Sequence, residues 1–315
     1  MMKQVFHKLL FLFALIACSK EEVTPDSTPP DDSEVPEVPT APDVYVLPVV
    51  VHVLHNGEEI GEGPNISFER IERQIEILNE DFRMEEGSRG FNDHSNGGDA
   101  RIEFVLAKQD PDGNPTNGIT RTKMSFADLP DDVVKREVDQ MGFFSYWNSE
   151  DYINIWTAPY GEDAANVILG SATGPDTDLP GDDAFAKPIP GGPEGIVINW
   201  WHFGETDLEG GRNLGRTLTH EMGHYLGLLH TWGKGECDAN DYCDDTPAAD
   251  EPVSSATTYI GCAGEEVMIA NYMNWTPDHV MNVFTNDQIS RMHHVLENSS
   301  RRTSLLTSKG LVDPD

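Results

Sequence analysis

The sequence predicts an α+β fold: a twisted, mixed five-stranded sheet with a backing helix and a second helix, then an irregular C-terminal part with a terminal helix. Three observations support this fold class. Short β-branched runs recur between residues 49 and 200, apolar residues recur at helical spacing, and the intervening segments are rich in Gly, Pro, Asp and Asn. With 315 residues, 38% of them hydrophobic, the chain can build a core in one or two domains.

The first 17 residues are typical of an export signal. Lys3 and Lys8 precede the apolar stretch 9–17, which is far too short to span a bilayer. Residues 15–18, Leu-Ile-Ala-Cys, resemble a bacterial lipobox, in which Cys18 is lipidated and becomes the first mature residue; the alternative is an ordinary signal peptide with a chance cysteine. Residues 19–22, Ser-Lys-Glu-Glu, resemble a signal that directs some Gram-negative lipoproteins to the cell surface. We therefore expect an outer-membrane lipoprotein, exposed at the cell surface or released.

Residues 18–43 are predicted to form an extended tether, because they are mostly Pro, Asp, Glu, Ser and Thr with almost nothing to bury. No second hydrophobic segment follows, so any membrane attachment is expected through the lipid alone. One catalytic unit, a monomer, is expected over residues 44–310. The formal charge of −34 argues against a nucleic-acid partner, because Lys and Arg are too few to neutralise phosphates.

The predicted elements of this unit follow in order. Residues 49–54 form a β-branched run typical of a buried strand. Apolar residues at helical spacing from Phe68 to Phe82, with Ser67 as N-cap, predict an amphipathic helix packed on the sheet. Further strands are predicted at residues 102–106, 152–156, 167–172 and 196–200.

The last predicted helix has a clear start signal. Thr285 and Gln288 have the spacing of a capping box, and Phe284 and Ile289 stand where a hydrophobic staple would. Ile289, Met292 and Leu296 supply its apolar stripe.

Residues 220–230, His-Glu-Met-Gly-His-Tyr-Leu-Gly-Leu-Leu-His, carry the clearest chemical signal. His220 and His224 lie four apart, so on a helix both can reach one zinc ion. Glu221 can reach a water on that metal without being a ligand, and so serve as general base. Gly227 allows a sharp exit from the helix, which brings His230 back as third ligand. Three protein ligands plus water indicate a catalytic site.

A surface helix with incidental histidines is the alternative interpretation of this motif. Residue frequencies multiplied over its fixed positions give odds of about 1 in 10⁴ for chance occurrence. Leu214 and Leu218 before the motif, with Tyr225 and Leu226 inside it, also predict a buried helix.

The motif resembles the elongated zinc signature of metzincin metallopeptidases. Residues 271–275, Asn-Tyr-Met-Asn-Trp, are similar to the methionine turn that these enzymes place beneath the zinc, with Met273 as its methionine. Residues 230–232 and 241–247 are similar to the pappalysin family, including its ulilysin- and cytophagalysin-like members. The resemblance implies a sheet with two helices above a cleft, an irregular lower half, and an edge strand at the upper rim made by Leu169, Gly170, Ser171 and Ala172. A substrate would add to that edge as an extended strand, although the segment could also be an ordinary exposed edge.

One residue departs from the family pattern. Ulilysin-like enzymes place a tyrosine two residues after the turn methionine, where its hydroxyl supports the tetrahedral intermediate, and this chain has Trp275. An indole N–H can donate a hydrogen bond but cannot act as an acid. Losing one such donor costs about 10²–10³ in rate, so a slower enzyme is expected.

The acidic loop after His230 resembles the calcium loop of ulilysin-like enzymes, which implies Asp241 and Thr246 as ligands. Asp245 and the main chain near Cys243 offer further hard oxygen atoms of the kind calcium favours. A solvated acidic turn is the alternative. If Cys18 is lipidated, Cys237, Cys243 and Cys262 remain, and export should oxidise two of these three; which pair forms stays open.

These observations together predict a secreted or surface-anchored zinc endopeptidase that hydrolyses extracellular proteins and peptides. The alternative is a non-catalytic surface lipoprotein, an adhesin or binding protein, that keeps zinc for structure. Glu221 argues against it, because a structural metal has no use for a general base. The substrate, the cleavage-site preference and the means of latency are not encoded in any motif.

Overall fold

The structure is a computed structural model that describes residues 43–128, 137–159, 169–235, 237 and 241–314. Residues 1–42 of the predicted signal and tether, Cys18 among them, lie outside the described residues, as do Val167 and Ile168 of one predicted strand. Residues Pro42–Asp315 group into one compact unit. Among the described residues, no helix has the length and apolar character needed to cross a bilayer.

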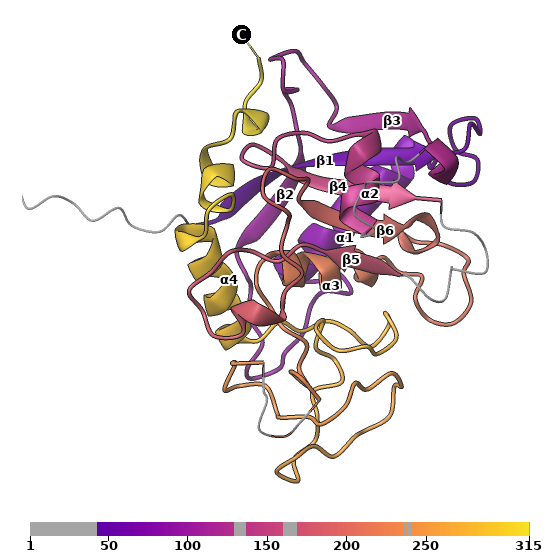
Figure 1. The fold of residues 1–315 in the computed structure, drawn as a ribbon. Helices are drawn as coiled ribbons and strands as arrows, with labels where there is room; N and C mark the ends of the chain where they lie inside the picture. Colours follow the sequence, from indigo (N-terminus) through magenta and orange to yellow (C-terminus); the bar gives the residue numbers. More distant parts are fainter. Residues whose placement is uncertain (1–42, 129–136, 160–168, 236, 238–240, 315) are drawn as a thin grey trace, which may run out of the picture. The chain divides into compact units, whose positions relative to one another are not determined.

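A mixed sheet forms the centre of this unit (Figure 1). Its strand order is β2-β1-β4-β6-β5, and β3 also pairs with β1. All pairs are parallel except β5 with β6, which are antiparallel. The strands are β1 (Tyr45–His55), β2 (Ile102–Leu106), β3 (Ile119–Lys123), β4 (Ile153–Ala158), β5 (Gly170–Ala172) and β6 (Gly195–Asn199).

The sheet has six strands where the sequence predicted five. The additional strand is β3, whose residues Ile-Thr-Arg-Thr-Lys lack the apolar alternation that identifies a half-buried strand. β1 is 11 residues long, so β2 pairs with its first half and β3 with its second half, along the same edge. The mixed α+β class itself is confirmed.

Helices cover both faces of the sheet. α1 (Phe68–Phe82) and α3 (Arg216–Tyr225) pack in one large core with Ile196 and Ile198 of β6. Val197, which points to the opposite face of the same strand, packs with Val138 and Met141 of α2 (Glu137–Phe144). The sequence does not predict α2, because only these two of its hydrophobic residues are buried and they make a weak pattern.

The local start signals of the first and last helices are confirmed. Ser67 caps α1 through its side-chain oxygen, which accepts a hydrogen bond from the Arg70 N–H. Thr285 and Gln288 form the complete capping box of α4 (Asn286–Asn298). Beyond α4, the Nε–H of buried Arg302 donates to the Tyr225 carbonyl at 2.9 Å, and its guanidinium pairs with Glu194. The C-terminal segment is thereby fixed to the end of α3.

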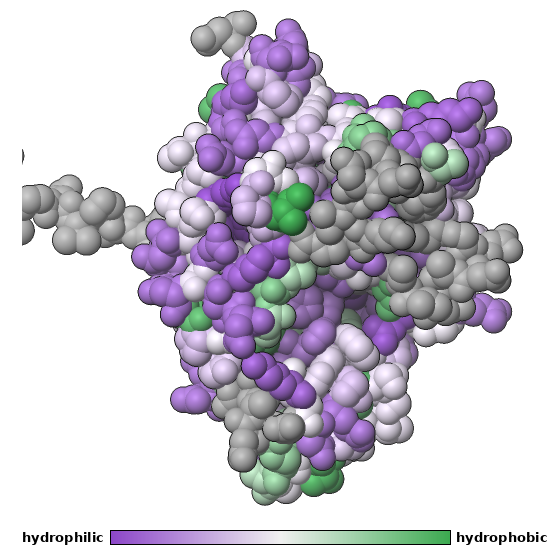
Figure 2. Space-filling model, in the orientation of Figure 1, coloured by the Kyte–Doolittle hydropathy of each residue, from purple (hydrophilic) through white to green (hydrophobic). Residues whose placement is uncertain are grey.

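Between α3 and α4 the described residues form neither helix nor strand beyond isolated bridges, as the sequence predicted. A small separate core holds this lower half together, formed by Trp232, Ala249, Val253 and Val267. Cys237 and Cys262 form a disulfide, while Cys243 is free and buried. The pairing that the sequence left open is therefore 237–262. Figure 2 shows a largely hydrophilic face with hydrophobic residues in small separate groups, in agreement with the acidic composition.

Candidate metal centre and cleft

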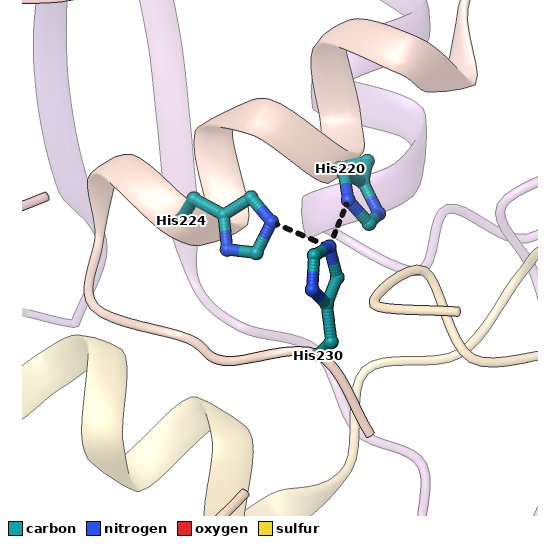
Figure 3. A group of neighbouring side chains, drawn as sticks. All are labelled: His220, His224 and His230. Carbon is teal, nitrogen blue, oxygen red and sulfur yellow. Dashed lines mark hydrogen bonds between the residues drawn. The ribbon is translucent and has the colours of Figure 1, made fainter. Parts of the chain in front are cut away.

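Helix α3 and the turn after it bring three histidines together. His220 and His224 lie one turn apart on α3, which ends at Tyr225. Gly227 then adopts φ +90°, a left-handed conformation that favours glycine, and the chain reverses. The reversal places His230 opposite the two helical histidines, as the sequence predicted (Figure 3).

The three imidazole rings present their Nε2 atoms to one point. His230 Nε2 lies 3.2 Å from His220 Nε2 and 3.1 Å from His224 Nε2. The Nδ1 atoms of the two helical histidines lie 2.7 Å from the Tyr272 carbonyl and 2.8 Å from the Leu228 carbonyl. A carbonyl only accepts, so these Nδ1 atoms carry the protons and their Nε2 atoms carry lone pairs.

This arrangement fits a zinc ion. A single proton on His230 Nε2 could satisfy only one of the two facing lone pairs, whereas a cation at the centre satisfies all three. Zinc–nitrogen bonds of 2.0–2.1 Å at tetrahedral angles hold the nitrogens about 3.3 Å apart, close to the observed separations. Burial lowers the pKa of His220 to about 3 and that of His224 to about 4, and the pKa of His230 also falls well below its usual range. The rings are therefore neutral, which is the form that binds metals.

Glu221 lies beside this cluster in the same cavity, which has a volume of about 450 Å³. Burial raises the pKa of Glu221 to about 8, and the negative charge of Glu137 adds to the effect. A divalent cation nearby would act in the opposite direction and favour the carboxylate. The carboxyl group is thus placed where its charge depends on the metal.

Strand β5 borders the cavity and forms an edge of the sheet. Gly170 packs so closely that a Cβ atom there would stand 2.8 Å from Cγ of Glu221. The flanking residues pair with β6, through Asn199 N–H to Leu169 O and Thr173 N–H to Gly195 O. By the alternation of an antiparallel ladder, the main-chain groups of Gly170 and Ala172 then point away from β6, to the open side.

The predicted methionine turn lies beneath the histidines. A Cβ atom on Gly223 of α3 would stand 2.4 Å from the sulfur of Met273, so the two segments pack without a gap. Tyr272 supplies the carbonyl that orients His220, but its ring is fully buried against Phe284 and does not line the cavity. Tyr272 therefore cannot replace the tyrosine that ulilysin-like enzymes place two residues after the turn methionine.

Trp275 does line the cavity, and 44% of its surface is exposed. Its ring meets that of His230 edge-on, with centroids 5.4 Å apart. Trp232, two residues after His230, stacks on His230 with ring centroids 4.2 Å apart and an interplanar angle of 9°. The third histidine is thus enclosed by two indoles.

Two charged residues, Asp278 and Arg212, also line the cavity. Buried Asp278 accepts the Leu214 N–H through Oδ2 at 2.8 Å, while its Oδ1 has no hydrogen-bond partner among the described residues. Burial raises the pKa of Asp278. Arg212, which sequence reasoning missed, lines the same cavity and donates to the Trp275 carbonyl. It precedes α3 in an irregular segment, so no periodicity could have revealed it.

The acidic loop forms its own hydrogen bonds. The Thr246 hydroxyl donates to the Asp241 carboxylate at 2.8 Å, and the Cys243 N–H donates to the same carboxylate at 3.2 Å. Asp245 accepts the Asp287 N–H at the start of α4. Burial raises the pKa of Asp241 to about 7. A calcium ion at these residues stays a prediction.

Three comparisons with known proteins agree with this geometry. The family described as "Pregnancy-associated plasma protein-A", peptidase M43, matches residues 137–297. Mature mirolysin of Tannerella forsythia, in complex with a cleaved peptide, is 32% identical; the alignment covers 88% of this chain and 100% of that one, with a TM-score of 0.70. An extracellular metalloprotease of Verticillium alfalfae is 28% identical over 79% of this chain and 76% of its own length.

A second fungal relative matches a shorter part of the chain. An extracellular metalloprotease of Colletotrichum graminicola is 33% identical over 150 residues, which are 45% of this chain. The match spans 48% of that relative, about half its length.

A mixed sheet above a histidine-bearing helix, with a methionine turn beneath the histidines, defines the metzincin class of metallopeptidase fold. Within that class, this chain belongs to the pregnancy-associated plasma protein-A, or pappalysin, family. The family resemblance inferred from the sequence is confirmed, and the family implies a metal, typically zinc.

Proposed function

We propose that this protein is an exported zinc-dependent endopeptidase. The observation that carries the proposal is the convergence of three neutral imidazoles beside Glu221, in a cavity bordered by an open sheet edge. His220, His224 and His230 would hold the ion. The relatives named extracellular metalloproteases support both the activity and the export. Attachment through a lipid on Cys18 belongs to the same proposal.

Each group in the site has a separate part in peptide hydrolysis. Zinc, when bound, supplies the Lewis acid that polarises the scissile carbonyl and makes water a usable nucleophile near neutral pH. Glu221 accepts the proton of the attacking water and passes it to the leaving amine. The Trp275 indole N–H donates to the carbonyl oxygen as negative charge develops there, in place of a tyrosine hydroxyl.

The substrate binds in extended form. Residues Leu169–Ala172 offer it the outward main-chain groups of Gly170 and Ala172, so affinity comes from strand addition and is largely independent of sequence. The cleaved peptide in the mirolysin complex supports a peptide substrate. Asp278 adds a preference, because an unpaired buried carboxylate oxygen is best satisfied by a cationic side chain. We propose that the cavity beside Asp278 binds an Arg or Lys side chain of the substrate.

The test uses the purified full chain. Glu221→Ala should keep its zinc and lose casein cleavage by about 10²–10⁴-fold, the usual contribution of a general base. Undiminished cleavage by this variant would remove Glu221 from the mechanism. Cleavage-site profiling on a peptide library, with and without a zinc chelator, then reports the preference. Cuts that persist in chelator would refute the zinc mechanism, and cuts with no basic residue nearby would refute the role of Asp278.

A non-catalytic zinc-containing lipoprotein is the second candidate function. The observation in its favour is Trp275, which stands where the resemblance implies a tyrosine. Zinc binding without chelator-sensitive proteolysis would establish it.

A further inference from the structure

His230 is held differently from the other two histidines. His220 and His224 each have a carbonyl oxygen 2.7–2.8 Å from Nδ1, which fixes the ring plane and the tautomer. His230 lies in the turn after α3, and among the described residues its Nδ1 has no comparable partner. Something else must set the plane of this imidazole.

The indole ring of Trp232 stacks on the His230 imidazole. The two rings are nearly parallel, 9° apart, with centroids at 4.2 Å, and Trp275 closes the cluster 5.0 Å from Trp232. Trp232 is 7% exposed, and its buried indole belongs to the small core with Val253 and Val267. The plane of the stack is therefore fixed by packing in the lower half of the molecule.

We propose that Trp232 is a positioning residue for the third metal ligand. Its indole holds the His230 imidazole in the plane that directs Nε2 toward His220 and His224 before an ion arrives. Coordination withdraws electrons from the imidazole, which strengthens its attraction to the electron-rich indole face. The affinity of the metal centre thereby depends on this indole and not on the small core as a whole. This proposal rests on the zinc site proposed above and is independent of peptide hydrolysis.

The experiment measures metal affinity. Trp232→Leu, Trp232→Phe and Val253→Ala are prepared in the full chain, stripped of metal, and titrated with zinc against a chromophoric chelator and with cobalt(II). Trp232→Leu should bind zinc about 10-fold more weakly, as for other residues that orient a ligand, and its cobalt spectrum should change. Trp232→Phe keeps a flat ring on His230 and should retain most of the affinity. Val253→Ala weakens the same core without touching His230, so its unfolding temperature should fall while its zinc affinity stays.

Two outcomes would overturn the proposal: wild-type zinc affinity and cobalt spectrum in Trp232→Leu, or an equal loss in Val253→Ala. If Trp232→Leu does not fold, NMR of the zinc-free wild-type protein decides. The His230 ring protons should then show the upfield shift of a stacked indole, and unshifted signals would refute preorientation. Wild-type protein that binds no zinc would overturn the proposed function itself, whereas protein that binds zinc but cleaves nothing leaves the role of Trp232 intact.

Discussion

Removal of the Cys237–Cys262 disulfide should destabilise the lower half of the molecule by a predictable amount. The two cysteines are 25 residues apart in sequence. For a loop of that length, the chain-entropy relation gives a stabilisation of about 3.5 kcal/mol at 25 °C. The described part of the enclosed segment, residues 241–261, has no helix or strand, and the two core residues Ala249 and Val253 are its main apolar anchors. The loss of stability should therefore be confined to the lower half of the molecule.

The assay compares urea unfolding of Cys237→Ser/Cys262→Ser with that of the parent, both carrying Cys18→Ser and Cys243→Ala so that no thiol can exchange. Because the chain has six tryptophans, the difference in fluorescence between each protein and its Trp232→Phe counterpart follows the lower half, and far-UV circular dichroism follows the sheet and helices. We expect the fluorescence midpoint to fall first, by the equivalent of about 3.5 kcal/mol. Coincident transitions, or a change below about 0.5 kcal/mol, would refute the view that this covalent link holds an otherwise weak segment together.

Two further predictions concern single side chains. Burial lowers the pKa of His52 to about 4, so His52 stays neutral in the folded protein. In the unfolded chain the same imidazole takes up a proton below about pH 6.5. The free energy of unfolding should therefore fall by about 3 kcal/mol as the pH drops from 6.5 to 4. His52→Gln should remove that part of the slope in pH-dependent denaturant unfolding, and an unchanged slope would contradict the assignment. Gly170→Ala places a methyl group against Glu221, so kcat on a peptide should fall by about 10–100-fold with zinc affinity unchanged. A wild-type kcat in this variant would contradict the prediction, because it would show that β5 can shift to accommodate the methyl group without displacing Glu221.

Local signals in the sequence were sufficient to predict much of the fold and the convergence of the three histidines. Ser67 and Thr285 cap helices through neighbours three residues away, and the histidine motif needs only one helix and one reversal at Gly227. These features depend on residues close in sequence, where spacing alone fixes which groups meet.

The features that sequence reasoning missed depend on distant contacts. β3 is polar and becomes a strand because the second half of β1 offers it a free edge. Arg212 reaches the cavity from an irregular loop and is recognised only by its contact with Trp275, 63 residues away. Trp232 carries no periodicity, and its stacking on His230 follows from how the lower half packs. Tertiary contacts of this kind leave no trace in local spacing.

The link between Arg302 and Tyr225 has a consequence for the order in which the protein is made. The helix that carries His220 and His224 emerges from the ribosome about 80 residues before the guanidinium that fastens its last turn, and chains fold from the N-terminus as they emerge. We therefore expect the histidine cluster to reach its final rigidity only after nearly the whole polypeptide has been synthesised.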